Sequence, residues 1–323
     1  KYGADVEFTL HKNLGLQLRG NYYHDTREIG AQEFLVADNQ SLGEMYADLV
    51  IQRMDLIDGW DAGVRINPLR GWHFEAQFRH QNAESKHGYR YNPENTTDSL
   101  TKAQYAEVRL GFRFAPFEKK MRLGEREIRM DKGAVILWAT VTKGLKGILS
   151  SDHDYWKADL KLQGKFRIRK LGMEHWQLSA GWISSPTPYL KMYTPKANFE
   201  DLSVFSPNSF ETMRPNEFLN QYQIAVHHRH NFGSWKTGIN WIRPEFHWAN
   251  NFGIGWLTKP QVHTGLTIQD MSMGFYETGL VIEDIIKVNL IGIGAGVFYR
   301  YGPYAYTDQI DNLAFKLSMK IGF

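Results

Sequence analysis

Three histidines lie close together past the middle of the chain, at His227, His228 and His230. Alternate residues of a strand point to the same face, so His228 and His230 could both reach one metal ion. Their spacing offers no third ligand, and polar side chains beside a turn are the favoured interpretation. We therefore predict no metal and no cofactor. His228 and His230 are the residues that would bind a metal ion if this prediction were wrong.

A second polar group, Asp152, His153 and Asp154, has the oxygen ligands that hard cations prefer, but it falls where an exposed loop would simply be hydrated. The chain has no cysteine (Cys 0), which excludes thiolate metal sites and cysteine nucleophiles. A hydrolase would need a Ser–His or Asp–His pair within hydrogen-bond reach. Because the chain contains 12 histidines, chance pairs are expected, and no spacing distinguishes one of them. We predict no catalytic residue and no enzyme.

The charged residues are scattered along the whole chain. The sequence has 38 basic and 35 acidic residues, for a formal net charge of +3. No block of like charge marks an arm that binds nucleic acid. We therefore expect no nucleic-acid partner.

The elements that carry these side chains show period-two alternation. Over residues 105–114 and 155–169, apolar residues alternate with charged ones, so each strand has one apolar and one ionic face. The second run is long enough, when tilted, to cross a bilayer. The ionic faces are expected to point into the lumen of a closed sheet, with the charged residues Glu107, Arg109, Arg113, Lys157, Asp159, Lys161, Lys165 and Arg167.

Strand length separates a membrane protein from a soluble one. Strands of soluble sandwiches usually have about 5 or 6 residues. An outward apolar band bordered by aromatic residues is typical of outer-membrane barrels, and Trp72, Trp156 and Trp182 fall near strand ends. The sequence predicts an all-β fold: a transmembrane antiparallel outer-membrane β-barrel of about 14 strands. It forms a single domain over residues 1–323, and a leader and further strands are expected upstream.

The final strand has the same alternation and ends on an aromatic residue. Its apolar face resembles the C-terminal β-signal that outer-membrane barrels present to their assembly machinery. The residues of this face are Phe315, Leu317, Met319, Ile321 and Phe323.

The connections are expected to be short on one side of the membrane and long on the other. Short periplasmic turns are predicted at residues 69–71, 170–173, 232–235 and 284–287. Longer external segments are predicted at residues 82–101, 184–220 and 302–312. Gly292, Gly294 and Gly296 share an inward face, where small residues let a plug, a loop or a neighbouring backbone come close.

Several segments resemble one family, the Bacteroidota-type outer-membrane barrels of unknown function in which a carboxypeptidase-regulatory-like domain precedes the barrel. The matching segments are KYGADVEFTL, LGFRFAPFEKK, TVTKGLKGILSSDHDYWKADLKL, FSPNSFETMRPNEFLNQYQIAVHHRHNF and GFYETGLVIEDIIKV. The third is the most specific, and the chain departs from the pattern at Asn220 and Gln221. The resemblance implies that an N-terminal regulatory or plug-like domain is absent from this chain. It brings no catalytic residue.

Three functions from different classes remain. The first is a non-enzymatic subunit or scaffold of a multi-protein outer-membrane complex that serves protein assembly or export. The second is a transport pore, although Glu107 and Asp159 interrupt the inward basic residues. The third is a barrel-borne hydrolase. In each case we expect a multi-pass protein of the cell outer membrane. Its expected partners are outer-membrane lipid, other outer-membrane or surface proteins and, during biogenesis, the barrel-assembly machinery.

Overall fold

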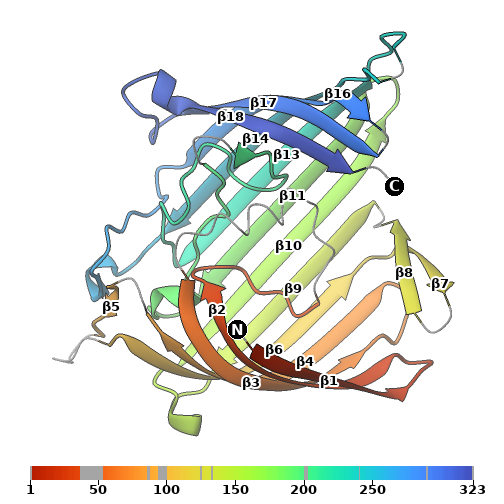
Figure 1. The fold of residues 1–323 in the computed structure, drawn as a ribbon. Coiled ribbons are helices and arrows are strands. Elements are labelled where there is room, and N and C mark those ends of the chain that lie inside the picture. Colours follow the sequence, from red (N-terminus) through yellow and green to blue (C-terminus); the bar gives the residue numbers. More distant parts are fainter. Residues whose placement is uncertain are drawn as a thin grey trace.

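A single curved sheet dominates the computed structural model (Figure 1). The structure describes residues 2–36, 54–85, 88–93, 100–123, 126–131, 134–199, 203–239, 241–288 and 290–321. The long strands are β1 (Tyr2–His11), β2 (Leu16–Glu28), β3 (Met54–Ile66), β4 (Trp72–Glu84), β6 (Lys102–Phe114), β9 (Val135–Gly144), β10 (Tyr155–Ile168), β11 (Gly172–Ile183), β13 (Tyr222–Ser234), β14 (Glu245–Trp256), β16 (Phe275–Val288), β17 (Ile291–Tyr301) and β18 (Leu313–Ile321).

Short elements lie in the connections between the long strands. They are the strands β5 (Arg90–Tyr91), β7 (Lys119–Leu123), β8 (Arg126–Asp131), β12 (Ser203–Val204) and β15 (His263–Thr264), and the 3-10 turns η1 (Ile148–Ser150), η2 (Tyr189–Lys191), η3 (Pro260–Val262) and η4 (Ile310–Asn312). Among the described residues, no helix is long and apolar enough to cross a membrane.

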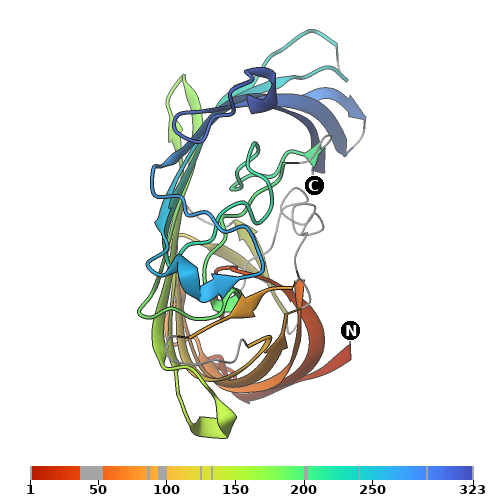
Figure 2. The same ribbon diagram turned by 90° about the vertical axis from the view of Figure 1, so that its left-hand side faces the viewer.

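The 14-stranded sheet follows chain order from β1 to β18, each long strand pairing antiparallel with the next, and the two-residue β12 pairs in parallel with β18. The predicted all-β antiparallel fold and strand number are confirmed. The sheet curls round on itself (Figure 2) but does not close, since no pairing joins β1 to β18 among the described residues.

Strand alternation separates two faces of the sheet. On β10, Trp156 and Leu160 are exposed on the convex face, whereas Lys157 and Asp159 are buried on the concave face. The register carries this pattern across neighbouring strands, because Leu160 lies opposite Ala139 of β9 and Ala180 of β11. An apolar outer face with a polar inner face is what a membrane-embedded sheet requires.

Two of the four predicted turns are confirmed and two are wrong. The chain turns between β3 and β4 and between β10 and β11, as expected for residues 69–71 and 170–173. Residues 232–235 instead continue β13 to Ser234, and the connection follows it. Residues 284–287 lie inside β16, where Asp284 has a φ of 51° at a register shift between Ile282 and Ile286. A bulge bends a strand without ending its pairing, which explains the false turn.

The long connections gather at the end of the sheet opposite the short turns, which we call the long-loop end. They follow β2, β4, β9, β11, β14 and β17. The predicted external segments 82–101 and 302–312 lie there, although β4 extends to Glu84 before its loop begins. The prediction that residues 184–220 are external is wrong, because this connection folds back into the concave side, where β12 pairs with β18. The β7–β8 hairpin between β6 and β9 lies at the other end, the short-turn end, and was not predicted.

The space on the concave side is occupied by the connection between β11 and β13. We call residues 184–221 the inner segment; its residues 200–202 are outside the described part. Figure 2 shows it crossing the hollow of the sheet. It contributes side chains to two buried apolar clusters, including Tyr189 and Met192 in one and Phe210 and Met213 in the other.

Candidate functional site

A buried ion-pair network ties the long-loop half of the inner segment to the sheet wall. Lys191 Nζ lies 2.7 Å from Glu107 Oε1, and Arg79 Nη2 lies 2.5 Å from Glu107 Oε2. Tyr155 also donates a hydrogen bond to Glu107. The Glu33 carboxylate, from the connection after β2, completes the network by contacting Arg79 at 2.6 Å and Arg109 at 3.0 Å. Strands β4, β6 and β10 and two connections therefore meet at one point.

The neighbouring charges and burial shift the pKa values of Glu33 and Lys191, the two members of the network that come from connections. Burial on its own would raise the pKa of Glu33, but Arg79, Arg27 and Arg109 hold that pKa well below its usual range. Burial lowers the pKa of Lys191 to about 7, with Arg79 acting in the same direction and Glu107 opposing it. The short contact between Lys191 and Glu107 favours the ion pair.

A second buried network anchors the other half of the inner segment. Glu277 of β16 accepts hydrogen bonds from the backbone N–H groups of Glu211 and Thr212, both at 2.8 Å, and from Asn251 Nδ2 at 2.6 Å. Glu211 Oε2 lies 3.2 Å from Lys316 Nζ, which also bonds Asn198 and Ser203. β14, β16 and β18 are thus joined to the inner segment by polar groups that are fully buried.

The carboxylates of both networks are already engaged by arginine, lysine, tyrosine or backbone N–H groups. Breaking a buried pair by removing one partner is costly, whereas an apolar substitute for the whole pair often is not. We therefore expect these networks to fix where the inner segment sits more than to raise the stability of the protein.

The eight predicted lumen-facing charges do not form one site. Glu107, Arg109, Arg113, Lys157 and Asp159 are buried, Lys161 and Lys165 are half-buried, and Arg167 is exposed. Glu107 and Arg109 belong to the first network, and Lys157 donates a hydrogen bond to the backbone oxygen of Lys191 at 3.1 Å. Arg113 pairs with Glu118 at 2.7 Å, and Lys157 lies 4.0 Å from Asp159.

Sequence reasoning missed the residues that the connections supply. Glu33, Lys191 and Glu211 stand in irregular segments, where no periodicity indicates which way a side chain points. Glu277 could have been found, because β16 alternates and Glu277 shares its inward face with Val281, whereas the half-buried Tyr276 and Thr278 point the other way. Glu211 lies in the stretch FSPNSFET, which carries part of the family resemblance.

His228 and His230 do meet, on one carboxylate. His228 Nε2 and His230 Nδ1 each lie 2.7 Å from an oxygen of Glu174, which stands on the neighbouring strand β11. His230 also contacts the backbone oxygen of Leu171 at 3.1 Å. The third histidine of the motif, His227, points to the other face and contacts Asn251.

The polar group at residues 152–154 is separated by the fold. His153 is buried against the rings of Tyr91 and Tyr105, and burial lowers its pKa to about 4. Asp154 is exposed and pairs with Lys143. The three side chains therefore do not surround a common point.

The face named as the β-signal is apolar and exposed where it is described. Phe315, Leu317 and Met319 have exposed fractions of 63%, 41% and 51%. Ile321 ends β18, and Phe323 lies outside the described residues.

The inward glycines of β17 leave room for their neighbours. A Cβ on Gly292 would lie 1.7 Å from Asp284 Oδ1, and one on Gly296 would lie 3.0 Å from Val281 Cγ2. Lys320 and Lys316 of β18 stand opposite these two glycines and reach past them to carboxylates. Small residues here allow close approach of other groups.

Comparison with known proteins supports the fold but does not assign the chain to a family. No family model matches the sequence, and no curated protein matches it. Among solved structures, the chain is similar to BamA from Haemophilus ducreyi lacking POTRA domains 1–3, at 12% identity and a TM-score of 0.55, covering 98% of this chain and 61% of that one. CdiB from Acinetobacter baumannii matches at 10% identity, covering 99% of this chain and 56% of that chain, but its TM-score of 0.37 carries no argument. The chain spans less than two thirds of either structure, and the likeness to BamA shows the fold of an outer-membrane β-barrel.

Proposed function

We propose that this protein is a non-enzymatic outer-membrane β-barrel that acts as a subunit or scaffold of a multi-protein complex for protein assembly or export. The proposal includes the kinship with Bacteroidota-type barrels that carry a preceding regulatory-like domain. The likeness to BamA supports the barrel fold on which this choice rests, and the choice of role is an analogy from that fold.

The observation that carries the proposal is the ordered filling of the concave side. At the long-loop end, residues from separate connections pack into one buried cluster that includes Tyr89, Tyr189, Leu219 and Val262. Tyr89 stacks on Tyr189 with ring centroids 3.8 Å apart and donates to, or accepts from, His263 at 2.7 Å. A fixed surface of this kind suits a protein partner better than the free passage of solutes.

The apolar tips of the loops offer a place for such a partner. Ile148 and Leu149 are neighbours in the connection between β9 and β10 at the long-loop end, and they are exposed by 45% and 49%. Adjacent exposed apolar groups can mark an interaction site. The convex face, which carries Leu110, Leu160 and Leu280, faces lipid in this proposal.

Native affinity purification of the full-length protein from outer membranes tests the proposal. We expect one or more proteins in a fixed ratio to the barrel, identified by mass spectrometry. The double variant Ile148→Ser, Leu149→Ser should lose them without lowering the amount of folded barrel. A matched variant on the opposite end, Leu171→Ser, should retain them. Recovery of the barrel alone, at every detergent tested, would contradict the role as a complex subunit.

A pore is the second candidate, and conductance separates it from the first. In planar lipid bilayers we expect no steady conductance from the intact protein, because the inner segment fills the concave side. Replacing residues 196–214 with a short Gly/Ser linker removes the Glu211 and Thr212 contacts to Glu277, and steady openings should appear. Steady conductance of the unaltered protein would favour the pore.

A further inference from the structure

Three side chains converge at the short-turn end of the concave face, apart from the inner segment's networks. Glu245 and His247 stand two residues apart on β14, so they share one face of that strand. Glu283 of β16 is the direct cross-strand partner of Glu245. Like charges placed directly opposite each other destabilise a sheet unless a cation lies between them. The sequence placed none of these residues in a site.

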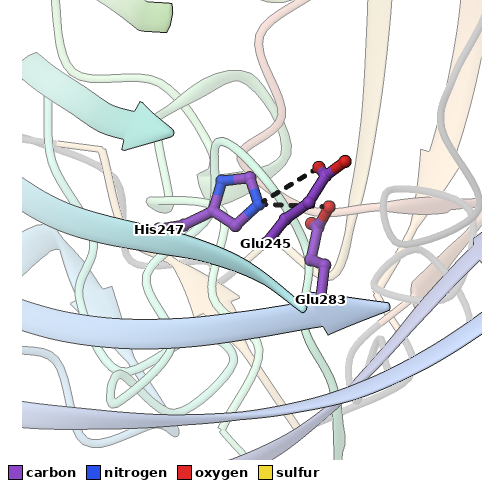
Figure 3. Close-up of side chains that lie close together, drawn as sticks. All are labelled: Glu245, His247 and Glu283. Carbon is purple, nitrogen blue, oxygen red and sulfur yellow. Dashed lines mark ion pairs between the residues drawn. The ribbon is translucent and has the colours of Figure 1, made fainter. Parts of the chain in front are cut away.

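The donor atoms of these residues are spaced as metal ligands are. All three ligand atoms lie within 4.8 Å of one another. His247 Nε2 is 3.3 Å from Glu283 Oε2 and 3.9 Å from Glu245 Oε2, and the ring is directed at both carboxylates (Figure 3). Around an ion with bonds of about 2.0 to 2.2 Å, neighbouring ligands are roughly 3 to 3.5 Å apart. Side-chain shifts of less than about 1 Å would complete the geometry.

Unsatisfied polar atoms point to a missing ligand at this place. His247 is 3% exposed. Its Nδ1 has no hydrogen-bond partner within the described part of the chain, and its Nε2 faces the two carboxylates at 3.3 and 3.9 Å without the geometry of a full hydrogen bond. Asp284 is also 3% exposed, and its Oδ1 atom has no hydrogen-bond partner among the described residues. Buried polar atoms are nearly always bonded in proteins, and an unpaired one calls for an explanation such as an ion.

A lysine takes the place of a cation in this structure. Lys320 Nζ lies 2.9 Å from Glu245 Oε2, 3.5 Å from Glu283 Oε2 and 3.7 Å from Asp284 Oδ2. It reaches them across Gly292, its partner on β17, which has no side chain to block the path. Its side chain is 40% exposed and can swing out to solvent. Arg229 Nη1 lies 3.4 Å from Glu283 Oε1, the other oxygen of that carboxylate. Glu283 Oε2 therefore remains directed at His247 and Lys320.

We propose that Glu245, His247 and Glu283 bind a divalent transition-metal ion, and that the Lys320 ammonium competes for the same position. One imidazole nitrogen with carboxylate oxygens suits ions such as Zn²⁺, whereas Ca²⁺ and Mg²⁺ prefer oxygen ligands alone. Three protein ligands leave a coordination position for water or for another group. A bound ion would cross-link β14 and β16 at the end of the sheet where β18 also meets them.

Zinc titration of the full chain in detergent tests the site. After chelator treatment and dialysis, calorimetry with ZnCl₂ is expected to give one stoichiometric site, and CaCl₂ should give none. Lys320→Gln should tighten zinc binding by at least about tenfold, because it removes a competing positive charge a few ångströms away. His247→Gln and Glu283→Gln should each weaken it by more than about 10 to 100-fold, the cost of losing a group that only orients a ligand, because each removes a direct ligand.

The other histidine cluster supplies the matched control. His228→Gln with His230→Gln removes the group that contacts Glu174 on the opposite face and should leave the affinity unchanged. Loss of binding in that double variant, with binding retained in His247→Gln, would overturn the proposal. So would the absence of a stoichiometric site in a folded Lys320→Gln protein. Heat-modifiable mobility in gels reports folding for each variant.

Discussion

Replacing Leu160 with arginine is expected to lower the free energy of unfolding by about 2 to 4 kcal/mol, the cost of a charge at mid-membrane on the lipid face of a barrel. Leu160 stands near the middle of β10 and is 38% exposed on the convex face. Its cross-strand neighbours Ala139 and Ala180 are small, so the arginine would have no polar partner beside it. Urea unfolding from lipid vesicles measures the change.

The matched control is Gln163→Arg on the same strand and the opposite face. Gln163 bonds Gln177 and lines a cavity of about 240 Å³ together with Asn208 and Asn251. An arginine there finds polar neighbours, so we expect a much smaller loss. Equal tolerance of the two substitutions would contradict the assignment of the convex face to lipid. Equal intolerance would indicate that packing, not lipid, governs both positions.

The sheet could be predicted from the sequence because the alternation within each strand identifies its apolar and its polar face. The alternation of Trp156 and Leu160 with Lys157 and Asp159 needs no knowledge of the neighbouring strands. Turns are less secure, since local composition cannot tell a bulge from a reversal. Asp284 illustrates this, because its positive φ bends β16 while pairing resumes at Ile286.

The candidate sites could be predicted only where one strand carries the whole group. His228 and His230 share a strand face, so their meeting could be foreseen, but their partner Glu174 comes from β11. The cluster of Glu245, His247 and Glu283 joins two strands through a register that no periodicity reveals. Position within a sheet depends on pairing, which is a long-range property of the chain.

The Glu107 network supplies the second large effect. Glu107→Ala should lower the free energy of unfolding by about 3 to 5 kcal/mol, because it leaves the buried cations Lys191 and Arg79 without their shared carboxylate. Arg79 keeps Glu33 at 2.6 Å, so the larger share of the penalty falls on Lys191. The inner segment should also become sensitive to protease, which limited digestion of the folded protein would reveal.

A double variant separates the loss of the ion pair from a loss of packing. If the penalty is an uncompensated charge, adding Lys191→Met to Glu107→Ala should recover a large part of the lost stability, since removing both charges of a buried pair costs little. Glu107→Gln keeps the shape of the side chain and should fall between the wild type and Glu107→Ala. Losses that simply add in the double variant would show that Lys191 and Glu107 are not coupled. The inner segment would then be held by its apolar contacts around Tyr189 and Met192 instead.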